Sequence, residues 1–439
     1  MSWPQPNYNQ GYGAPPPPHG GGYGGYAPPP GPPGGGYAPP PGPPGGGYPG
    51  GPYGAPPGAP PAHGYGAPPP QPGYGAPPPH HGHGGHHHHQ PSYHAPPPMG
   101  APYGAPMGGG FFYLGVPVPP PPPHMPAAPP PGYNPTADVE RIRKATKGFG
   151  TDEGALIATL APMDAMQVDA VSRAFKATTG KDLLKVLEKE TSGWFEAALR
   201  AKVLGPVGYD VWLIHRACDG AGTHEDILNE VLLCRTNAEM HVLKQAYQAT
   251  YGKNMEKVVE DELSFKTKRM FTMAMQGVRQ DDNAPVDPHM VEADIRDLHS
   301  AARGAGTDEI KICGILCQRS TPHLAAVAHG YARQHKRPLS KMINSEFSGH
   351  MEDALRFIVD GAENALERDA RLIEDSMKGM GTKDERLVYR IARNHWNRAR
   401  FEEVKRAYAA VCHKKGLKHR VEGETSGDYK RMMSAMVGS

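Results

Sequence analysis

A short glycine-rich pattern occurs four times in the chain and constrains its fold more than any other feature. The copies read KGFGTDE from residue 147, DGAGTHE from 219, RGAGTDE from 303 and KGMGTKD from 378. Their second glycines lie 72, 84 and 75 residues apart, at Gly150, Gly222, Gly306 and Gly381. A nearly fixed period of this length indicates one supersecondary unit that is repeated four times.

The repeated unit is expected to be helical. Val168, Val171 and Phe175 follow the three-four spacing of a helix, and the alternation typical of strands is absent. Glycines and capping residues divide the unit into five short helices, the first of which precedes the glycine pattern. The sequence therefore predicts an all-α fold. We expect an arm at 1–136, repeats at 137–205, 206–278, 289–362 and 363–439, and a linker at 279–288.

The arm has a different composition from the repeats. Residues 1–136 contain no Lys, Arg, Asp or Glu and consist mainly of Pro, Gly, Tyr, Ala and His. Such a segment buries too little apolar surface to offset chain entropy, so we expect it to be disordered. It is either a solvated spacer or a self-associating segment whose tyrosines stack between molecules. The His-rich run at 80–89 could bind zinc or copper, or be a low-complexity expansion.

Charge and cysteine content limit the classes of function. The net charge is +2, which gives the folded part no basic character and makes nucleic-acid binding by this part unlikely. Five cysteines without a C-x-x-C pair fit reduced thiols in a cytosolic protein. No apolar leader or membrane-length segment occurs, so we expect a cytoplasmic protein.

The glycine pattern has a simple structural interpretation. A glycine in the left-handed conformation ends one helix, and Thr151, Asp152 and Glu153 cap the next. A nucleotide-binding interpretation fails because the pattern follows a helix rather than a strand, and no phosphate-loop motif occurs. No Ser-His-Asp or Cys-His set stands out either, so we expect a protein without enzymatic activity.

Helix capping does not explain why a glutamate follows each glycine pattern at a nearly fixed distance in the sequence. Glu190, Glu262 and Glu346 each lie 40 residues after the second glycine, and Glu424 lies 43 residues after it. Gly-x-Gly lets the backbone turn its carbonyl oxygens outward, and the helices between can return the acid beside them. Hard oxygen ligands with coordination positions left open suit calcium better than magnesium or a soft metal.

A calcium ion held by one carboxylate keeps positive charge and open coordination positions. An anionic phospholipid headgroup can fill those positions, so calcium and membrane should bind cooperatively, and four loops should add avidity. The residue between the glycines stands at the loop tip, and we expect Phe149 and Met380 to contact the membrane. Ala221 and Ala305 can add little there.

These motifs resemble the annexin core. The resemblance rests on the four glycine patterns, on the downstream ETSG, ELSF, EFSG and ETSG, and on the long middle linker; the arm resembles that of long-tailed, synexin-like annexins. It implies a curved disc of four five-helix repeats with calcium loops on the convex face. The calcium ligands that it implies are the carbonyls of Thr146, Gly148 and Gly150 with Glu190; of Cys218, Gly220 and Gly222 with Glu262; of Ala302, Gly304 and Gly306 with Glu346; and of Met377, Gly379 and Gly381 with Glu424.

The function expected from these observations is calcium-dependent binding to anionic phospholipid membranes, in membrane organisation, vesicle aggregation or trafficking. The protein would be peripheral on membranes when calcium rises. The first and third sites fit the pattern best, the fourth has three extra residues before its acid, and the second carries Asp219 and Phe265 in place of a basic residue and a glycine. Two alternatives are a scaffold whose arm condenses proteins or RNA, and a calcium-gated ion pathway.

Overall fold

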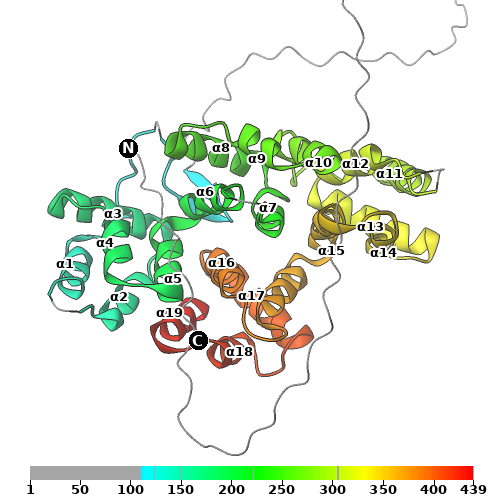
Figure 1. Cartoon of the computed structure of the whole chain (residues 1–439). Helices are drawn as coiled ribbons and strands as arrows, with labels where there is room; N and C mark the ends of the chain where they lie inside the picture. The colour runs from blue at the N-terminus through cyan, green and yellow to red at the C-terminus, as the bar shows by residue number, and fades with distance from the viewer. Residues whose placement is uncertain (1–109, 123, 149, 221, 304–305, 439) are drawn as a thin grey trace, which may run out of the picture. The chain divides into compact units, whose positions relative to one another are not determined.

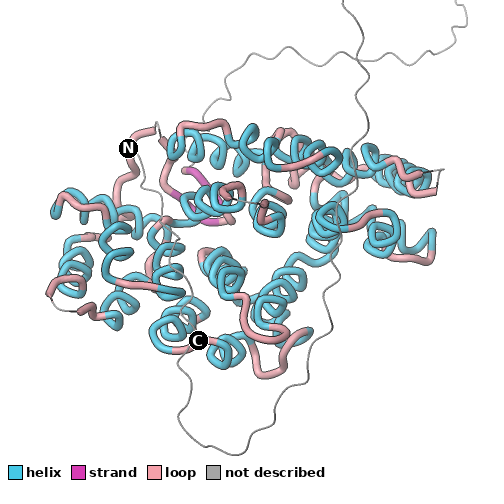
Figure 2. Tube along the Cα trace, viewed as in Figure 1, coloured by secondary structure: helices cyan, strands magenta, loops and turns pink. Residues whose placement is uncertain are grey.

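The computed structural model describes residues 110–439 except 123, 149, 221, 304–305 and 439. The expectations for the arm as far as residue 109, including its tyrosine repeats and the His-rich run at 80–89, lie outside the described residues. The described part consists of helices joined by loops, apart from one hairpin (Figures 1 and 2). The expected all-α fold is confirmed.

The first two repeats each contain five helices, as the punctuation of the sequence predicts. The first repeat comprises α1 (Thr136–Ala145), α2 (Glu153–Leu160), α3 (Ala165–Thr179), α4 (Leu183–Glu190) and α5 (Gly193–Val203). The second comprises α6 (Gly205–Ala217), α7 (Glu225–Leu232), α8 (Asn237–Tyr251), α9 (Met255–Glu262) and α10 (Phe265–Met275). In both repeats a capping box starts the third helix and a left-handed glycine ends it.

The third and fourth repeats share one long helix. They comprise α11 (Pro288–Ala301), α12 (Glu309–Gln318), α13 (Thr321–His335), α14 (Leu339–Glu346), the shared α15 (Gly349–Met377), α16 (Asp384–His395), α17 (Arg398–Val411), α18 (Leu417–Glu424) and α19 (Gly427–Val437). The backbone of α15 leaves the helical region at Asn364, with φ −160° and ψ 89°. Asn364 Oδ1 accepts from the Glu367 N–H at 3.1 Å and so caps the second half as a new helix.

The repeats pack in pairs within this unit. Helix α5 of the first repeat packs against α16 and α19 of the fourth, and α10 of the second packs against α12 of the third. The core consists of the aliphatic and aromatic positions of these helices, among them the repeated aromatics Phe175, Tyr247, Tyr331 and Tyr408, which are all buried. The repeats therefore share one continuous core, as repeated units that cannot bury their apolar faces alone require.

Residues 110–135 contradict the expectation that the whole arm is disordered. Instead of belonging to a disordered segment, they begin with an antiparallel hairpin of β1 (Phe111–Tyr113) and β2 (Val116–Val118). Leu114 and Gly115 both have positive φ, at 52° and 75°, as a two-residue hairpin turn requires. The charge-free composition concealed a short apolar segment with a turn, which buries Tyr113 and Val118 against the helices.

Polar contacts fix the hairpin to the second repeat, and an ion pair connects one of them to the fourth. The Tyr113 hydroxyl donates to Asp210 Oδ2 at 2.7 Å, and the Leu114 N–H donates to Glu239 Oε1 at 2.8 Å. Arg393 of the fourth repeat pairs with the same buried Asp210 at 2.9 Å. Burial, with the Asp210 carboxylate next in importance, raises the pKa of Tyr113 well above its ordinary value. The phenol therefore stays a neutral donor.

Candidate functional site

The four glycine loops have one common backbone closure. In each loop the N–H of the second residue after the second glycine donates to the carbonyl seven residues earlier, at 2.8 to 3.0 Å. The pairs are Asp152 with Ala145, His224 with Ala217, Asp308 with Ala301, and Lys383 with Ser376. The same closure in four different sequences indicates that the loop geometry is set by the glycines rather than by the flanking side chains.

The backbone conformation of the four loops requires glycine at the described glycine positions of the pattern. The seven that are described have φ between 82° and 116°, and Gly304 lies outside the described residues. A Cβ on any of these seven would meet nothing within 4 Å. Glycine is therefore needed for its positive φ and not because the space is crowded, as expected for a loop that must aim its carbonyl oxygens in one direction.

The threonine after each second glycine connects the loop to the distant acid. Thr307 and Thr382 donate from Oγ1 to the carboxylates of Glu346 and Glu424 at 2.7 and 2.8 Å. The Oγ1 of Thr151 donates to the Glu190 backbone carbonyl at 3.0 Å. In the second repeat Thr223 contacts both the carbonyl and the carboxylate of Glu262, at 3.3 and 3.5 Å. Loop and acid thus lie side by side in all four repeats.

This role of the threonines was not expected from the sequence. Thr151 was expected to cap a helix, but the capping residue of α2 is Asp152, whose Oδ1 accepts from the Ala155 N–H at 2.9 Å. The invariance of threonine across the four patterns was the available signal, because capping alone also accepts Ser, Asp or Asn. Its hydroxyl instead holds the returning helix end beside the loop.

The first loop offers a cation the oxygen atoms that calcium requires. No described residue donates a hydrogen bond to the carbonyls of Thr146, Gly148 or Gly150, so these oxygens are available. The Glu190 carboxylate is also available, since Thr151 uses its backbone oxygen. Backbone carbonyls with one carboxylate form a hard, incomplete ligand set, which fits calcium better than magnesium or zinc.

The fourth loop differs because an arginine already lies in it. The Arg420 guanidinium forms an ion pair with Glu424 and donates to the Met377 carbonyl, which are two of the expected calcium ligands. Helix α18 brings Arg420 to this position because it lies one turn before Glu424. Two of the four expected ligands of the fourth loop therefore come together, around the Arg420 guanidinium.

The second loop keeps its geometry despite two unusual residues. Phe265 adopts φ 43°, in the left-handed region where the other three repeats have Gly193, Gly349 and Gly427 at 58° to 63°. The ring therefore does not alter this turn. The second loop includes Cys218, and burial raises the pKa of its thiol to about 12. The thiol is neutral at physiological pH, so Cys218 can contribute only its carbonyl.

Exposed apolar residues lie beside two of the loops. Met380, between the glycines of the fourth loop, is fully exposed, and Phe265 is 91% exposed. Phe149, the expected contact of the first loop, lies outside the described residues. In the part of the chain that the structure describes, no helix is long and apolar enough to cross a bilayer, and no three His, Cys, Asp or Glu side chains form a metal site.

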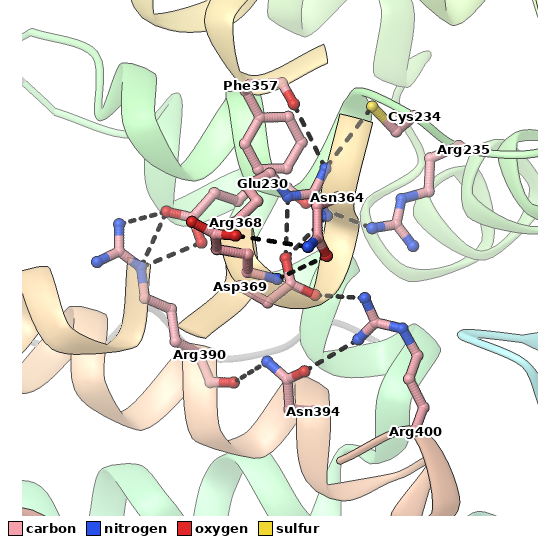
Figure 3. A network of polar contacts seen from close by, with 11 residues as sticks. Glu230, Cys234, Arg235, Phe357, Asn364, Arg368, Asp369, Arg390, Asn394 and Arg400 are labelled. Atoms are coloured by element: carbon pink, nitrogen blue, oxygen red, sulfur yellow. Dashed lines mark hydrogen bonds and ion pairs between the residues drawn. The ribbon is translucent and has the colours of Figure 1, made fainter. Parts of the chain in front are cut away.

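A central polar cavity bears on the expected alternative of an ion pathway. The cavity has a volume of about 340 Å³, and its lining includes seven arginines but only three acids, Glu230, Glu239 and Asp369. Burial alone would raise the pKa of Asp369, but the Arg368 and Arg400 guanidiniums lower it below its ordinary value. Figure 3 shows both arginines directed at Asp369. All seven arginines form ion pairs with acids, so the lining offers no free carboxylates along which calcium could pass.

Comparisons with known proteins agree with this geometry. The annexin family model matches residues 137–201, 209–274, 293–358 and 368–436. Annexin C1 of Cryptococcus neoformans var. grubii is 51% identical over 331 residues, covering 74% of this chain and 70% of that protein. Human annexin A7 is 36% identical over 302 residues; the match covers 69% of this chain and only 61% of annexin A7.

Solved structures show the same likeness. Annexin III aligns with a TM-score of 0.66 at 30% identity, covering 71% of this chain and 96% of that one. A variant of annexin A8 with an intact N-terminus aligns with a TM-score of 0.67 at 33% identity, covering 71% and 97%.

The fold and the four loops define a helical repeat protein in which each glycine loop lies beside a glutamate. The chain belongs to the annexin family. Annexins are non-enzymatic proteins that bind calcium and anionic phospholipid membranes, so calcium is the cofactor and the chain is not an enzyme.

Proposed function

We propose that this annexin binds anionic phospholipid membranes through calcium ions held in its glycine loops, and that it acts in the cytoplasm in membrane organisation, vesicle aggregation or trafficking. The observation that supports this most directly is the hydrogen bonding of the loop threonines to the distant glutamates. These bonds go to the carboxylate of Glu346 and of Glu424 and to the backbone carbonyl of Glu190, so in each of these repeats the glutamate lies beside glycines with positive φ. The proposed ligands are those that the family resemblance implied, with the fourth set in competition with Arg420.

The charge balance of each loop explains why lipid is needed. One carboxylate neutralises half of the charge of a calcium ion, and the backbone oxygens bring no charge. The bound ion therefore attracts a phosphate or carboxylate oxygen from a headgroup, which completes its coordination. By linkage, the lipid raises calcium affinity by the same factor as calcium raises lipid affinity.

Apolar side chains provide a second attraction at the membrane surface. We assign this role to Phe149 and Met380, and add Phe265 in the second repeat, where the residue between the glycines is only Ala221. A nearly fully exposed phenylalanine in a left-handed conformation combines an unfavourable backbone with an unfavourable exposure. Insertion into the headgroup region would offset both costs.

The direct test is vesicle co-sedimentation of the full chain with phosphatidylserine vesicles over a range of calcium concentrations. Glu190→Gln combined with Glu346→Gln should raise the calcium requirement at least tenfold, because each change removes the only charged ligand of a loop. Glu292→Gln with Glu403→Gln, on α11 and α17 away from the loops, is the matched control. Unchanged sedimentation of the first variant, with circular dichroism showing an intact fold, would mean that calcium binds elsewhere.

The fourth loop allows a gain-of-function test. Arg420→Gln removes the guanidinium that bonds Glu424 and the Met377 carbonyl, so both oxygens become available to a metal ion. We expect one additional calcium ion, or a severalfold tighter one, in lipid-free calorimetry. Arg406→Gln on α17 is a control with the same loss of charge. Identical titrations of Arg420→Gln and the natural chain would show that Arg420 does not compete with calcium.

Vesicle aggregation requires a second binding function, which we assign to self-association or partner binding through the arm. The hairpin changes how this is tested, because a deletion that reaches residue 136 would remove the buried Tyr113 together with the arm. Deleting residues 1–109 instead keeps the hairpin. Light scattering should then show loss of vesicle clustering with unchanged calcium-dependent sedimentation. Clustering that survives the deletion would assign it to the repeats.

A further inference from the structure

An open groove of about 1420 Å³ runs along the first repeat, beside the first loop. Its lining comes from α1, the C-terminal end of α3, α4 and residues 249–250 of α8, and includes Thr146 and Glu190 of the proposed calcium site. The cationic lining residues are Arg143, Lys147, Lys176, Lys181, Lys185 and Lys189. The acidic ones are Asp182 and Glu190, so the lining carries four more positive than negative charges.

The acids of the groove are already engaged. The Asp182 carboxylate caps α4 by accepting from the Leu184 and Lys185 N–H groups at 3.1 and 3.5 Å. Glu190 is assigned to calcium. Arg143 pairs with Glu140 at 2.9 Å, whereas Lys181, Lys185 and Lys189 form no ion pair with any described residue. The groove therefore presents uncompensated positive charge.

Only part of this charge is specific to the first repeat, because the third and fourth repeats keep Arg303 and Lys378 at the position equivalent to Lys147. At the positions equivalent to Lys147 and Lys189, the second repeat has Asp219 and Asp261, and the third and fourth repeats have Ser345 and Gly423 in place of Lys189. In the second repeat Asp261 also pairs with Lys257, the equivalent of Lys185, at 2.5 Å.

The spacing of the lysines favours one multivalent anion. Lys185 and Lys189 are one turn apart on α4, about 6 Å along the helix axis. Like charges at this spacing destabilise a helix, so a bound anion would relieve their repulsion. Lysine ammonium groups also suit phosphate oxygens, because they act as point charges with several rotatable donors.

We propose that the groove binds a multiply phosphorylated anion, such as a polyphosphorylated inositol, supplied either by a lipid headgroup or as a soluble molecule. The lipid source rests on the proposed membrane function, whereas the soluble source does not. Because Thr146 and Glu190 line the same groove, one phosphate of the anion can reach the open coordination positions of a calcium ion in the first loop. Calcium and the polyphosphate therefore reinforce each other at this repeat.

The test uses the full chain and inositol hexakisphosphate in calorimetry, with and without calcium. Lys185→Gln with Lys189→Gln should weaken binding roughly tenfold. The matched control is Lys253→Gln with Lys257→Gln, which removes the same charge from the equivalent segment of the second repeat. Equal weakening by both variants, or no effect of the first, overturns the assignment. Binding of a short single-stranded RNA in place of the inositol phosphate would also overturn it.

Two further arms identify the source of the ligand. Binding to phosphatidylcholine vesicles that contain phosphatidylinositol bisphosphate is compared with binding of soluble inositol hexakisphosphate. The comparison distinguishes a lipid headgroup from a free polyphosphate as the ligand. Binding of either one that depends on the groove lysines supports the proposal. Calcium-dependent binding to phosphatidylserine vesicles is measured in parallel. If the natural chain does not bind these vesicles in the presence of calcium, the proposed membrane function is refuted. If it binds them but binds no polyphosphate, only the groove proposal is refuted.

Discussion

The glycine loops of the first and second repeats have the same backbone conformation but are flanked by side chains of opposite charge. Both loops close through the same hydrogen bond and place a glutamate beside positive-φ glycines. The first loop is flanked by Lys147 and Lys189, and the second by Asp219 and Asp261. The second also has the exposed Phe265 where the first has a glycine. The glycine motif thus determines the loop backbone, while we propose that a few flanking side chains determine how each loop meets a membrane.

The largest expected effect is that two variants, Glu190→Gln and Glu262→Gln, rank in opposite order in vesicle binding and in lipid-free calorimetry. Asp219 and Asp261 attract calcium but repel lipid anions, and the lysines of the first repeat do the opposite. Glu190→Gln should therefore cost about tenfold in the calcium needed for vesicle binding, and Glu262→Gln only a few-fold. In lipid-free calorimetry Glu262→Gln should have the larger effect. The same ranking in both assays would remove the proposed difference between these loops.

A charge exchange should make the second repeat behave like the first. Asp219→Lys with Asp261→Lys replaces two negative charges by positive ones beside the second loop. We expect severalfold tighter binding to phosphatidylserine vesicles at subsaturating calcium and low salt, and a smaller gain at high salt because surface charges are screened. The converse variant, Lys147→Asp with Lys189→Asp, should weaken binding. A gain that does not depend on salt would contradict an electrostatic cause.

The smallest expected effect concerns Phe265. Phe265→Gly relieves about 1 to 2 kcal/mol of left-handed strain but adds roughly 1 kcal/mol of entropy to the unfolded chain, so the protein should become roughly 0.5 kcal/mol more stable. Vesicle binding should fall two- to threefold, about the loss of one partly inserted ring. Phe265→Asn, which tolerates positive φ but is polar, should reproduce the loss of binding. Normal binding by both variants would exclude membrane contact by the ring.

The repeated part of the fold followed from the sequence because its signals are local and occur four times. Glycine stops, caps and three-four spacing predicted five helices per repeat, and the structure has them. The break between the third and fourth repeats lies within α15 at Asn364, beside the expected boundary between residues 362 and 363, although neither proline nor glycine marks it. The hairpin was missed because its apolar residues are embedded in a low-complexity composition that predicts disorder.

The candidate site was less predictable where it depends on pairs of distant side chains. The spacing of glycines and acids predicted that loop and glutamate meet, and the threonine hydrogen bonds agree with this. It did not reveal Arg420 in the fourth loop, because the direction of a long side chain on α18 depends on tertiary packing. The basic groove was also hidden, since its lysines lie on and between successive helices of the first repeat, whose packing brings them together, and the net charge of the chain is only +2.

The hairpin also determines where mechanical load enters the molecule. Any pull on the chain that precedes residue 110 passes first to Tyr113, which is bonded to Asp210 of α6, and Asp210 is in turn held by Arg393 of α16. Tension is therefore carried by a buried triad that connects the second and fourth repeats, and not by the glycine loops. We expect a load applied there to strain the contact between the second and fourth repeats before it disturbs the glycine loops.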